Sequence, residues 1–327
     1  MFFKKLASAL TGAALSAAIL SYGSAASAAD IAVVTKAPVV GPSVPLDVHG
    51  FADFEVVNGR VTPGGLRIYP NRGYLTHVST GLSLDVYKDK TGFINSISFF
   101  GGVWNEVWSS PPVGGSAWQE MDWWVGFSVG FAQHWTFTAQ HLQFMFPGGA
   151  TDYNYTYTLA FDDSFLGWPV TINPYVNVFN NASGPSTVVL GDNGRTYRVE
   201  IGMAPRVALQ KATGIPLTLT FPTWVTVGPT SYWNRNDGTT NLCGTTGTLP
   251  CALSNAGLFS TGLQARLALD AFVPKRLGSW YLKGGVQYYR ILNDALLAAQ
   301  VVTGAAATFN DAESDVFIGN VGVGFTF

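Results

Sequence analysis

The sequence predicts an all-β protein, a single closed antiparallel transmembrane β-barrel of about twelve strands. Apolar residues recur at every second position along most of the chain, which is the period of a β-strand. After the N-terminal segment there is no clean run of ~20 apolar residues of the kind that a spanning helix requires. The longest uncharged stretch, residues 123–151, is interrupted by three Gln and two His. Since an open sheet edge finds no hydrogen-bonding partner in lipid, such strands must close on themselves.

The composition agrees with a membrane barrel. The chain is 12% charged and 14% aromatic, which is apolar for an exported soluble protein. Its mean hydropathy is positive although no peak of spanning length follows the N-terminal segment. An even spread of apolar residues at period two, without such a peak, is typical of a barrel.

A secretory signal peptide is expected over residues 1–29, and the barrel domain over residues 30–327. The segment begins with Lys4 and Lys5, continues with an apolar stretch, and ends in small residues that suit an A-x-A cleavage site. Its removal lowers the basic count from 18 to 16 against 20 acidic residues, so the mature net charge is −4. That mild balance gives no reason to expect a nucleic-acid partner.

The strands are assigned from alternation, and residues 153–161 are the clearest. There an aromatic residue or Leu fills every odd position and a small or polar residue every even one. Each segment is near the ~9–11 residues that a tilted membrane strand needs, or slightly longer. In chain order, the predicted strands are residues 46–57, 73–87, 92–104, 118–130, 135–146, 153–161, 169–180, 197–207, 215–227, 259–269, 280–289 and 314–327.

The predicted connections alternate in length. The short ones are residues 88–91, 132–134, 162–168, 210–214 and 270–279. The long ones are residues 58–72, 105–117, 181–195, 228–255 and 292–313, and only the short link 147–151 breaks the order. Short periplasmic turns that alternate with long outer loops are typical of an outer-membrane barrel. A soluble sandwich has no reason to alternate in this way.

The last strand ends in an aromatic residue. Phe327, Phe325, Val323 and Val321 lie on one face, while small or polar residues cover most of the other. The ending resembles the C-terminal strand of bacterial outer-membrane barrels, in which the assembly machinery reads the last Phe. The resemblance implies that Phe325 and Phe327 form an assembly signal, with the barrel-assembly machinery and outer-membrane lipid as partners. An edge strand of a soluble sandwich is the alternative.

Four stretches resemble a family of uncharacterised proteobacterial outer-membrane β-barrel proteins that are porin-like. They are residues 87–93, 223–229, 233–241 and 283–289. The likeness extends over the whole mature chain and implies an exported barrel in the outer membrane of a Gram-negative bacterium. It brings no known substrate and no catalytic residues.

Tryptophans gather where the predicted strands end. Amphipathic rings at both headgroup levels form the aromatic girdles of such barrels. A sugar-binding platform is the alternative for Trp104, Trp108 and Trp233, because these three border predicted outer loops.

Alternation places polar and charged side chains inside the barrel. The predicted lumen-lining residues are Glu120, Asp122, Arg198, Glu200, Arg206, Gln264, Arg266, Lys283 and Gln287. If the charges pair tightly, the barrel is a closed structural body. If they form opposed acidic and basic walls, they make a constriction for small polar solutes. Eight strands enclose only side chains and sixteen leave a wide pore, so about twelve strands leave both outcomes open.

No catalytic residue, metal or cofactor is predicted. The chain has four His, and His77 with Ser79 on the same strand face is not surrounded by a recognisable nucleophile motif. His134 falls in a predicted periplasmic turn, away from the outer rim that a protease site would need. The Asn-rich and Asp-rich loop 233–241 lacks the spaced carboxylates and the closing Glu of a calcium loop.

Residues 293–302 depart from period two. Asn293 could cap a short helix, on which Leu297 and Val301 would share one side. Leu296 and Gln300 would form the row beside them. A lid or plug near the outer rim and a simple extension of the strand both fit this segment.

A disulfide is predicted between Cys243 and Cys251, which lie close together in a Gly-rich and Thr-rich stretch of an exported chain. Because the bridge closes only a short loop, it stabilises by at most roughly 2–3 kcal/mol in the chain-entropy model. Its loss should loosen the loop without unfolding the barrel. Mass spectrometry of protein taken from the outer membrane is expected to find both thiols oxidised together, and free thiols there would refute the bridge.

The predicted function is a porin-like channel for the passive diffusion of small hydrophilic solutes. The alternative is a structural or surface-interaction barrel without an open pore, and an outer-membrane hydrolase is a third, weaker reading. A shift of the strand register by one residue would turn Arg198 and Arg206 toward lipid, at a free-energy cost of ~2–4 kcal/mol for each. Both side chains should therefore point inward. Their replacement by Glu is expected to shift ion preference toward cations and to leave insertion intact.

Overall fold

The computed structural model describes most of the predicted barrel domain, namely residues 47–62, 64–68, 73–111, 116–146, 151–183, 196–233, 254–302 and 305–327. The predicted signal peptide and the predicted bridge between Cys243 and Cys251 lie outside these residues and stay predictions. Among the helices in the described ranges, none is long and apolar enough to cross a membrane.

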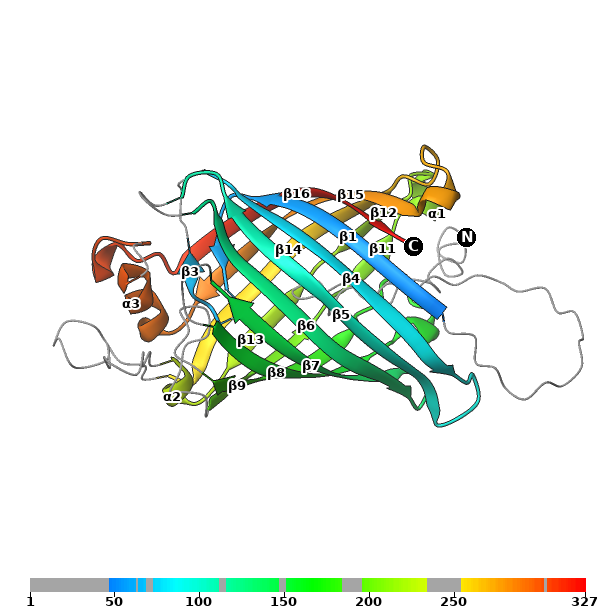
Figure 1. The fold of residues 1–327 in the computed structure, drawn as a ribbon, viewed down its shortest axis with the longest axis horizontal. Helices are drawn as coiled ribbons and strands as arrows, with labels where there is room; N and C mark the ends of the chain where they lie inside the picture. The colour runs from blue at the N-terminus through cyan, green and yellow to red at the C-terminus, as the bar shows by residue number, and fades with distance from the viewer. Residues whose placement is uncertain are drawn as a thin grey trace, which may run out of the picture.

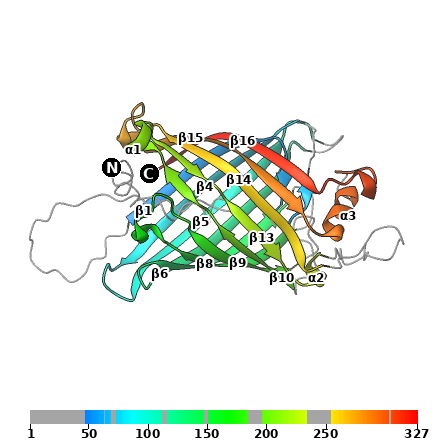
Figure 2. The same ribbon diagram turned by 180° about the vertical axis from the view of Figure 1, so that it is seen from behind.

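All the described strands except the hairpin of β2 (Arg60–Val61) and β3 (Arg67–Ile68) form one closed antiparallel sheet, in which successive strands pair and the last pairs with the first (Figures 1 and 2). Closure occurs where Phe51 of the first strand faces Thr326 of the last. The strands are β1 (Asp47–Val57), β4 (Leu75–Lys88), β5 (Ile94–Trp108), β6 (Trp118–Phe131), β7 (Trp135–Met145), β8 (Thr151–Phe161), β9 (Pro174–Ser183), β10 (Thr196–Met203), β11 (Arg206–Ala208), β12 (Leu217–Thr220), β13 (Thr223–Val227), β14 (Ala256–Ala268), β15 (Ser279–Ile291) and β16 (Asp315–Thr326).

Two of the twelve barrel strands are interrupted by proline. Pro205 separates β10 from β11 and Pro222 separates β12 from β13, because proline has no N–H to give to a ladder. Pairing continues across both breaks: the Phe221 N–H donates to the Pro205 carbonyl at 2.8 Å, and the Gly262 N–H to the Pro222 carbonyl at 3.0 Å. Each interrupted pair therefore counts as one strand. The predicted closed antiparallel barrel of about twelve strands is confirmed.

The seventh predicted strand, which corresponds to β9, was placed too early. It was expected over residues 169–180 but runs over Pro174–Ser183. The carboxylate of Asp163 accepts the N–H groups of Ile172 and Asn173 at 2.7 and 3.0 Å, which holds the residues before the strand in a turn. The short helix η2 (Ser164–Leu166) lies in the same turn. The strand β5, which was predicted over residues 92–104, instead continues to Trp108.

The outer face of the barrel is apolar on nearly every strand. Side chains that alternate with the inward set stay exposed, and in a water-soluble protein a patch of this extent would be a liability. The belt is the expected lipid-facing band of a transmembrane barrel. Its exposed members include Val48, Phe54, Val78, Leu82, Phe99, Val125, Phe127, Tyr155, Tyr157, Leu159, Val176, Tyr197, Ile201, Met203, Leu263, Leu282, Val286, Phe317 and Val321.

The short connections lie together at one end of the barrel, here called the turn end. The turn after β4 is held by Asp89, whose carboxylate accepts the Thr91 N–H and hydroxyl, both at 2.9 Å. These hydrogen bonds lower the pKa of Asp89, an exposed group, below its usual value. The helices α1 (Gln210–Thr213) and η3 (Lys275–Leu277) and the C-terminal Phe327 lie at the same end (Figure 1).

The opposite end, the loop end, carries extra structure, here called the cap. The cap consists of the hairpin β2 (Arg60–Val61) and β3 (Arg67–Ile68), the helix α2 (Thr230–Trp233) and the helix α3 (Asp294–Val302) (Figure 1). The helix η4 (Phe309–Asp311) follows α3. The Asn293 side chain accepts the Ala295 N–H at 3.1 Å and so caps α3. Of the two alternatives for this segment, the helix is the one that forms.

The cap packs on the barrel through a buried apolar core. Leu296 of α3, Val61 of the hairpin and Trp233 of α2 belong to one cluster with Phe144 and Leu142, which come from β7. The hairpin approaches α3 so closely that a side chain on Gly65, whose φ is 88°, would start 2.8 Å from Leu296. The loop end is therefore filled by packed side chains over the described part of the cap.

Candidate functional site in the barrel interior

Charges on the inner wall follow one row of paired residues around the barrel. Residues that face each other on neighbouring strands lie on the same side of a sheet, so the row can be traced from the register. Because the strands are tilted, this row of paired residues runs from one end of the barrel toward the other. The row is basic on β14, near the turn end, and acidic on β6, near the loop end. In order, its members are Arg266, Lys283, Gly322, Glu55, His77, Glu106 and Glu120.

The acidic end of this row binds Arg60 of the cap. Nη1 of Arg60 lies 3.2 Å from Oε2 of Glu106 and also forms an ion pair with Glu120. All three side chains are buried, and Glu106 is only 1% exposed. The guanidinium stacks over the Trp104 ring, with Cζ 4.7 Å from the ring centroid. Arg60 therefore ties the β2–β3 hairpin to the inner wall by a dry, two-carboxylate contact.

His77 extends this cluster toward the middle of the barrel. Its Nε2 lies 3.0 Å from Oε2 of Glu106, and its Nδ1 lies 3.9 Å from Oε2 of Glu55. Among the described contacts, the ring partners of His77 are carboxylates and the Trp104 ring, and no hydroxyl is paired with it. The arrangement suits a charge-balancing role rather than activation of a nucleophile.

Arg198 and Glu200 lie in a second buried cluster beneath α2. Glu200 accepts the Tyr175 hydroxyl at 3.0 Å and lies 3.5 Å from Nη1 of Arg198. The Arg198 guanidinium stacks on the Phe179 ring at 3.5 Å and hydrogen-bonds with Tyr232 of α2. Arg198 thus anchors the cap instead of facing open solvent. Its replacement by Glu would place two carboxylates together in a buried site, so the charge reversal proposed from the sequence tests selectivity only at Arg206.

Small polar side chains form a second continuous row on the wall built by β4 to β10. The hydroxyl of Ser98 donates to Asp85 at 2.5 Å, Ser128 and Thr138 share a hydrogen bond of 2.9 Å, and Thr158 donates to Asn177 at 3.2 Å. The four hydroxyl side chains are only half-buried. In order, the row is Asp85, Ser98, Ser128, Thr138, Thr158, Asn177 and Glu200. The interior is therefore polar and accessible toward the turn end.

The remaining predicted residues divide between the two halves of the interior. Gln287 is buried and donates to the Ser260 hydroxyl at 2.6 Å. Glu120 is buried against Arg60. Asp122, two residues further along β6, is also buried, and one of its carboxyl oxygens has no partner among the described atoms. Gln264 is half-buried on β14, opposite Thr220.

Lys283 and Arg266 face each other across β14 and β15 but differ in their partners. Lys283 forms ion pairs with Asp53 at 2.6 Å and with Glu55 at 3.4 Å. Arg266 is exposed within the interior and stacks over the Tyr281 ring at 3.7 Å. The two predicted basic residues are thus not equivalent, because among the described residues Lys283 has carboxylate partners and Arg266 has none.

Several interior residues were missed from the sequence. Asp53 and Glu55 flank Phe54, which is exposed to lipid, so alternation alone could have placed both inside. Glu106 was assigned to a loop because the predicted strand 92–104, which corresponds to β5, was ended too early. Arg60 carries no local signal, since it belongs to a connection that folds back into the mouth of the barrel.

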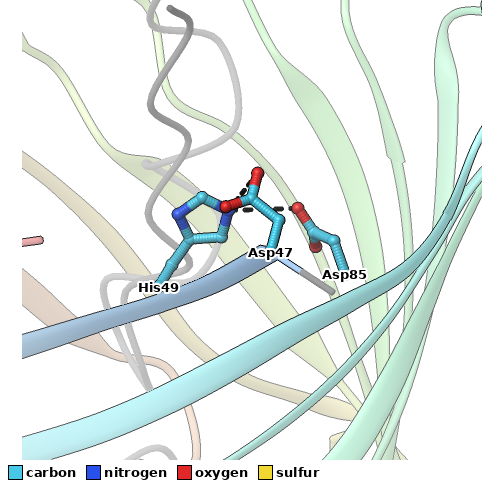
Figure 3. Close-up of side chains that lie close together, drawn as sticks. All are labelled: Asp47, His49 and Asp85. Atoms are coloured by element: carbon cyan, nitrogen blue, oxygen red, sulfur yellow. Dashed lines mark hydrogen bonds and ion pairs between the residues drawn. The ribbon is translucent and has the colours of Figure 1, made fainter. Parts of the chain in front are cut away.

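A candidate metal centre lies at the turn end, where Asp47, His49 and Asp85 converge (Figure 3). Nε2 of His49 lies 3.1 Å from Oδ2 of Asp85 and 3.3 Å from Oδ2 of Asp47. The ammonium of Lys88 lies 2.8 Å from Asp85 and 2.9 Å from Asp47, so a cation already balances both carboxylates. A metal ion would have to displace Lys88. The cluster is better explained as a set of ion pairs that joins β1 to β4.

The tryptophans do not all belong to girdles. Trp118, Trp135 and Trp168 are exposed near strand ends, as a girdle requires. Trp233 is fully buried, and its Nε1 donates to the carbonyls of Gly228 and Asn255, both at 3.2 Å. It is neither a girdle residue nor a sugar platform. Trp104 is half-buried inside the barrel beneath Arg60, so it is not a girdle residue, and its role as a sugar platform stays a prediction.

No protein-family model and no curated protein matches the chain. Among solved structures, the NanC porin in a rhombohedral crystal form aligns with 84% of this chain and 98% of its own, at 11% identity and a TM-score of 0.39. The transport unit of the autotransporter AIDA-I from Escherichia coli aligns with 88% of this chain and 93% of its own, at 10% identity and a TM-score of 0.34. Likeness of this degree carries no argument about activity. Membership in the family suggested by the sequence stays a prediction.

Proposed function

We propose that the chain is an outer-membrane channel for the passive diffusion of small hydrophilic solutes, with its turn end toward the periplasm and its loop end limited by the cap. The apolar belt around the barrel supports membrane insertion. The short turns at one end and the longer connections at the other support this orientation.

The observation that carries the channel is the row of half-buried hydroxyls on the wall of β5 to β8. Each Ser or Thr hydroxyl can donate and accept a hydrogen bond, so the row can replace part of the water shell of a passing solute. The opposite wall carries Arg266 and Lys283. A purely structural barrel would gain more stability from large apolar side chains in these interior positions.

A second candidate, a structural barrel without an open pore, is favoured by the cap. Arg60 is buried on Glu106 and Glu120, and Leu296 of α3 is fully buried. If the cap never leaves the mouth, the polar half of the interior is a water-filled cup that opens only to the turn end.

Recordings from planar lipid bilayers with the purified mature protein distinguish the two candidates. The channel predicts stepwise conductance that is absent when detergent alone is added. We expect steps smaller than those of a sixteen-stranded porin, because fewer strands enclose a narrower interior. Complete absence of steps from the wild-type protein and from a variant with a released cap would leave the structural barrel as the better account.

A further inference from the structure

We propose that Arg206 and Arg266 form a binding site for an oxyanion group, carboxylate or phosphate, of a small solute in the turn-end half of the interior. This inference rests on the proposed channel for its biological meaning, since it names the class of solute that the channel would favour. It concerns two guanidinium groups that the ion pairs described above leave unneutralised.

Arg206 is the more unusual of the two. It lies on β11, is only 6% exposed, and its Nε has no hydrogen-bond partner among the described atoms. Within the described part of the chain, no carboxylate forms an ion pair with it. A buried cation without a counter-charge is costly in a membrane protein, and such groups usually mark a solute or ion path.

Arg266 adds a second positive charge to the same region. It interacts electrostatically with Arg206, and both charges have the same sign. Asp53 of β1, which contacts the same Tyr281, is already engaged: Oδ1 contacts Lys283 at 2.6 Å, and Oδ2 accepts the Tyr281 hydroxyl at 2.7 Å. Arg266 instead stacks on Tyr281, which fixes the plane of the guanidinium. Its N–H groups are left accessible to a ligand in the interior.

The two side chains have the chemistry of an oxyanion clamp. A guanidinium presents a planar fork of N–H donors that matches the oxygens of a carboxylate or a phosphate. Thr220 and Gln264 lie beside Arg206 in the same row across β11, β12 and β14 and offer further uncharged donors. A bound anion would offset the repulsion between the two cations. Lys283 does not belong to the site, because Asp53 and Glu55 neutralise it.

Isothermal titration of inorganic phosphate into the purified, detergent-solubilised mature protein tests the site without requiring conductance. At low ionic strength we expect saturable binding to the wild type. The double variant Arg206→Met with Arg266→Met should bind about tenfold more weakly or worse, because both charge-assisted contacts are lost. Arg206→Lys keeps the charge but lacks the fork, so its affinity should lie between the two.

Arg290→Met is the matched control, because Arg290 is exposed at the loop end and pairs with Asp315. It should bind phosphate like the wild type. Heat-modifiable migration on gels shows whether each variant is folded. Equal affinity of the wild type and the double variant, or no saturable binding to the wild type, overturns the site. If phosphate binding depends on both Arg residues but the protein shows no conductance, the binding site is supported and the proposed channel is refuted. If the protein conducts but phosphate binding does not depend on the two Arg residues, the channel is supported and the binding site is refuted.

Discussion

Arg60→Met is expected to release the cap and to raise the conductance of the barrel above that of the wild type. The substitution removes the only cation that contacts both Glu106 and Glu120 among the ion pairs described. Among the ion pairs described, buried Glu120 would then keep no counter-charge, and buried Glu106 would keep only His77. Removal of one partner from a buried ion pair costs ~3–5 kcal/mol, and here most of that cost should fall on docking of the β2–β3 hairpin.

The measurement is bilayer conductance together with urea denaturation of the folded barrel. Arg290→Met serves as the control, because its pair with Asp315 is about half exposed and such surface pairs contribute ~0–1 kcal/mol. Adding Glu106→Gln and Glu120→Gln to Arg60→Met should restore part of the lost stability, since the uncompensated charges disappear. An Arg60→Met protein as stable and as closed as the wild type would show that Arg60 does not hold the cap.

Phe327→Ser is expected to reduce strongly the amount of barrel inserted in the outer membrane. Phe327 is 58% exposed on the lipid-facing side, and its N–H and carbonyl form two hydrogen bonds of 3.0 Å with Gly50 of β1. Serine keeps these backbone bonds but removes the terminal ring, which the assembly machinery is predicted to read. The ring also stacks near Phe325, with centroids 6.2 Å apart. The readout is the amount of heat-modifiable protein in the membrane fraction.

Phe317→Ser separates recognition of the terminus from simple loss of lipid contact. Phe317 lies on the same strand and the same face, is 64% exposed, and is located at the loop end of β16. Both substitutions remove one exposed aromatic ring from the apolar belt. If Phe327 is part of an assembly signal, only its loss should lower insertion strongly. Equal defects in the two variants would mean that the effect comes from lipid contact alone.

The sequence by itself determined the fold class, the strand count and most strand positions. In a barrel wall only one residue thick, each side chain faces either lipid or the interior, so alternation is a strong constraint. A shift of one residue would turn Arg198 and Glu200 into lipid while burying Tyr197 and Ile201. The two proline breaks did not disturb the assignment, because the pattern of faces continues across Pro205 and Pro222.

Only the tertiary structure decided which inward side chains meet and which remain unpaired. Alternation gives the face of a residue but not its neighbours across the interior, which depend on strand tilt and on how the connections fold. For this reason Arg198 could not be distinguished from Arg206, although Arg198 anchors α2 and Arg206 has no carboxylate partner in the described ranges. Arg60 and Trp233 belong to connections without a strand period, so their burial in the cap follows from packing at the loop end alone.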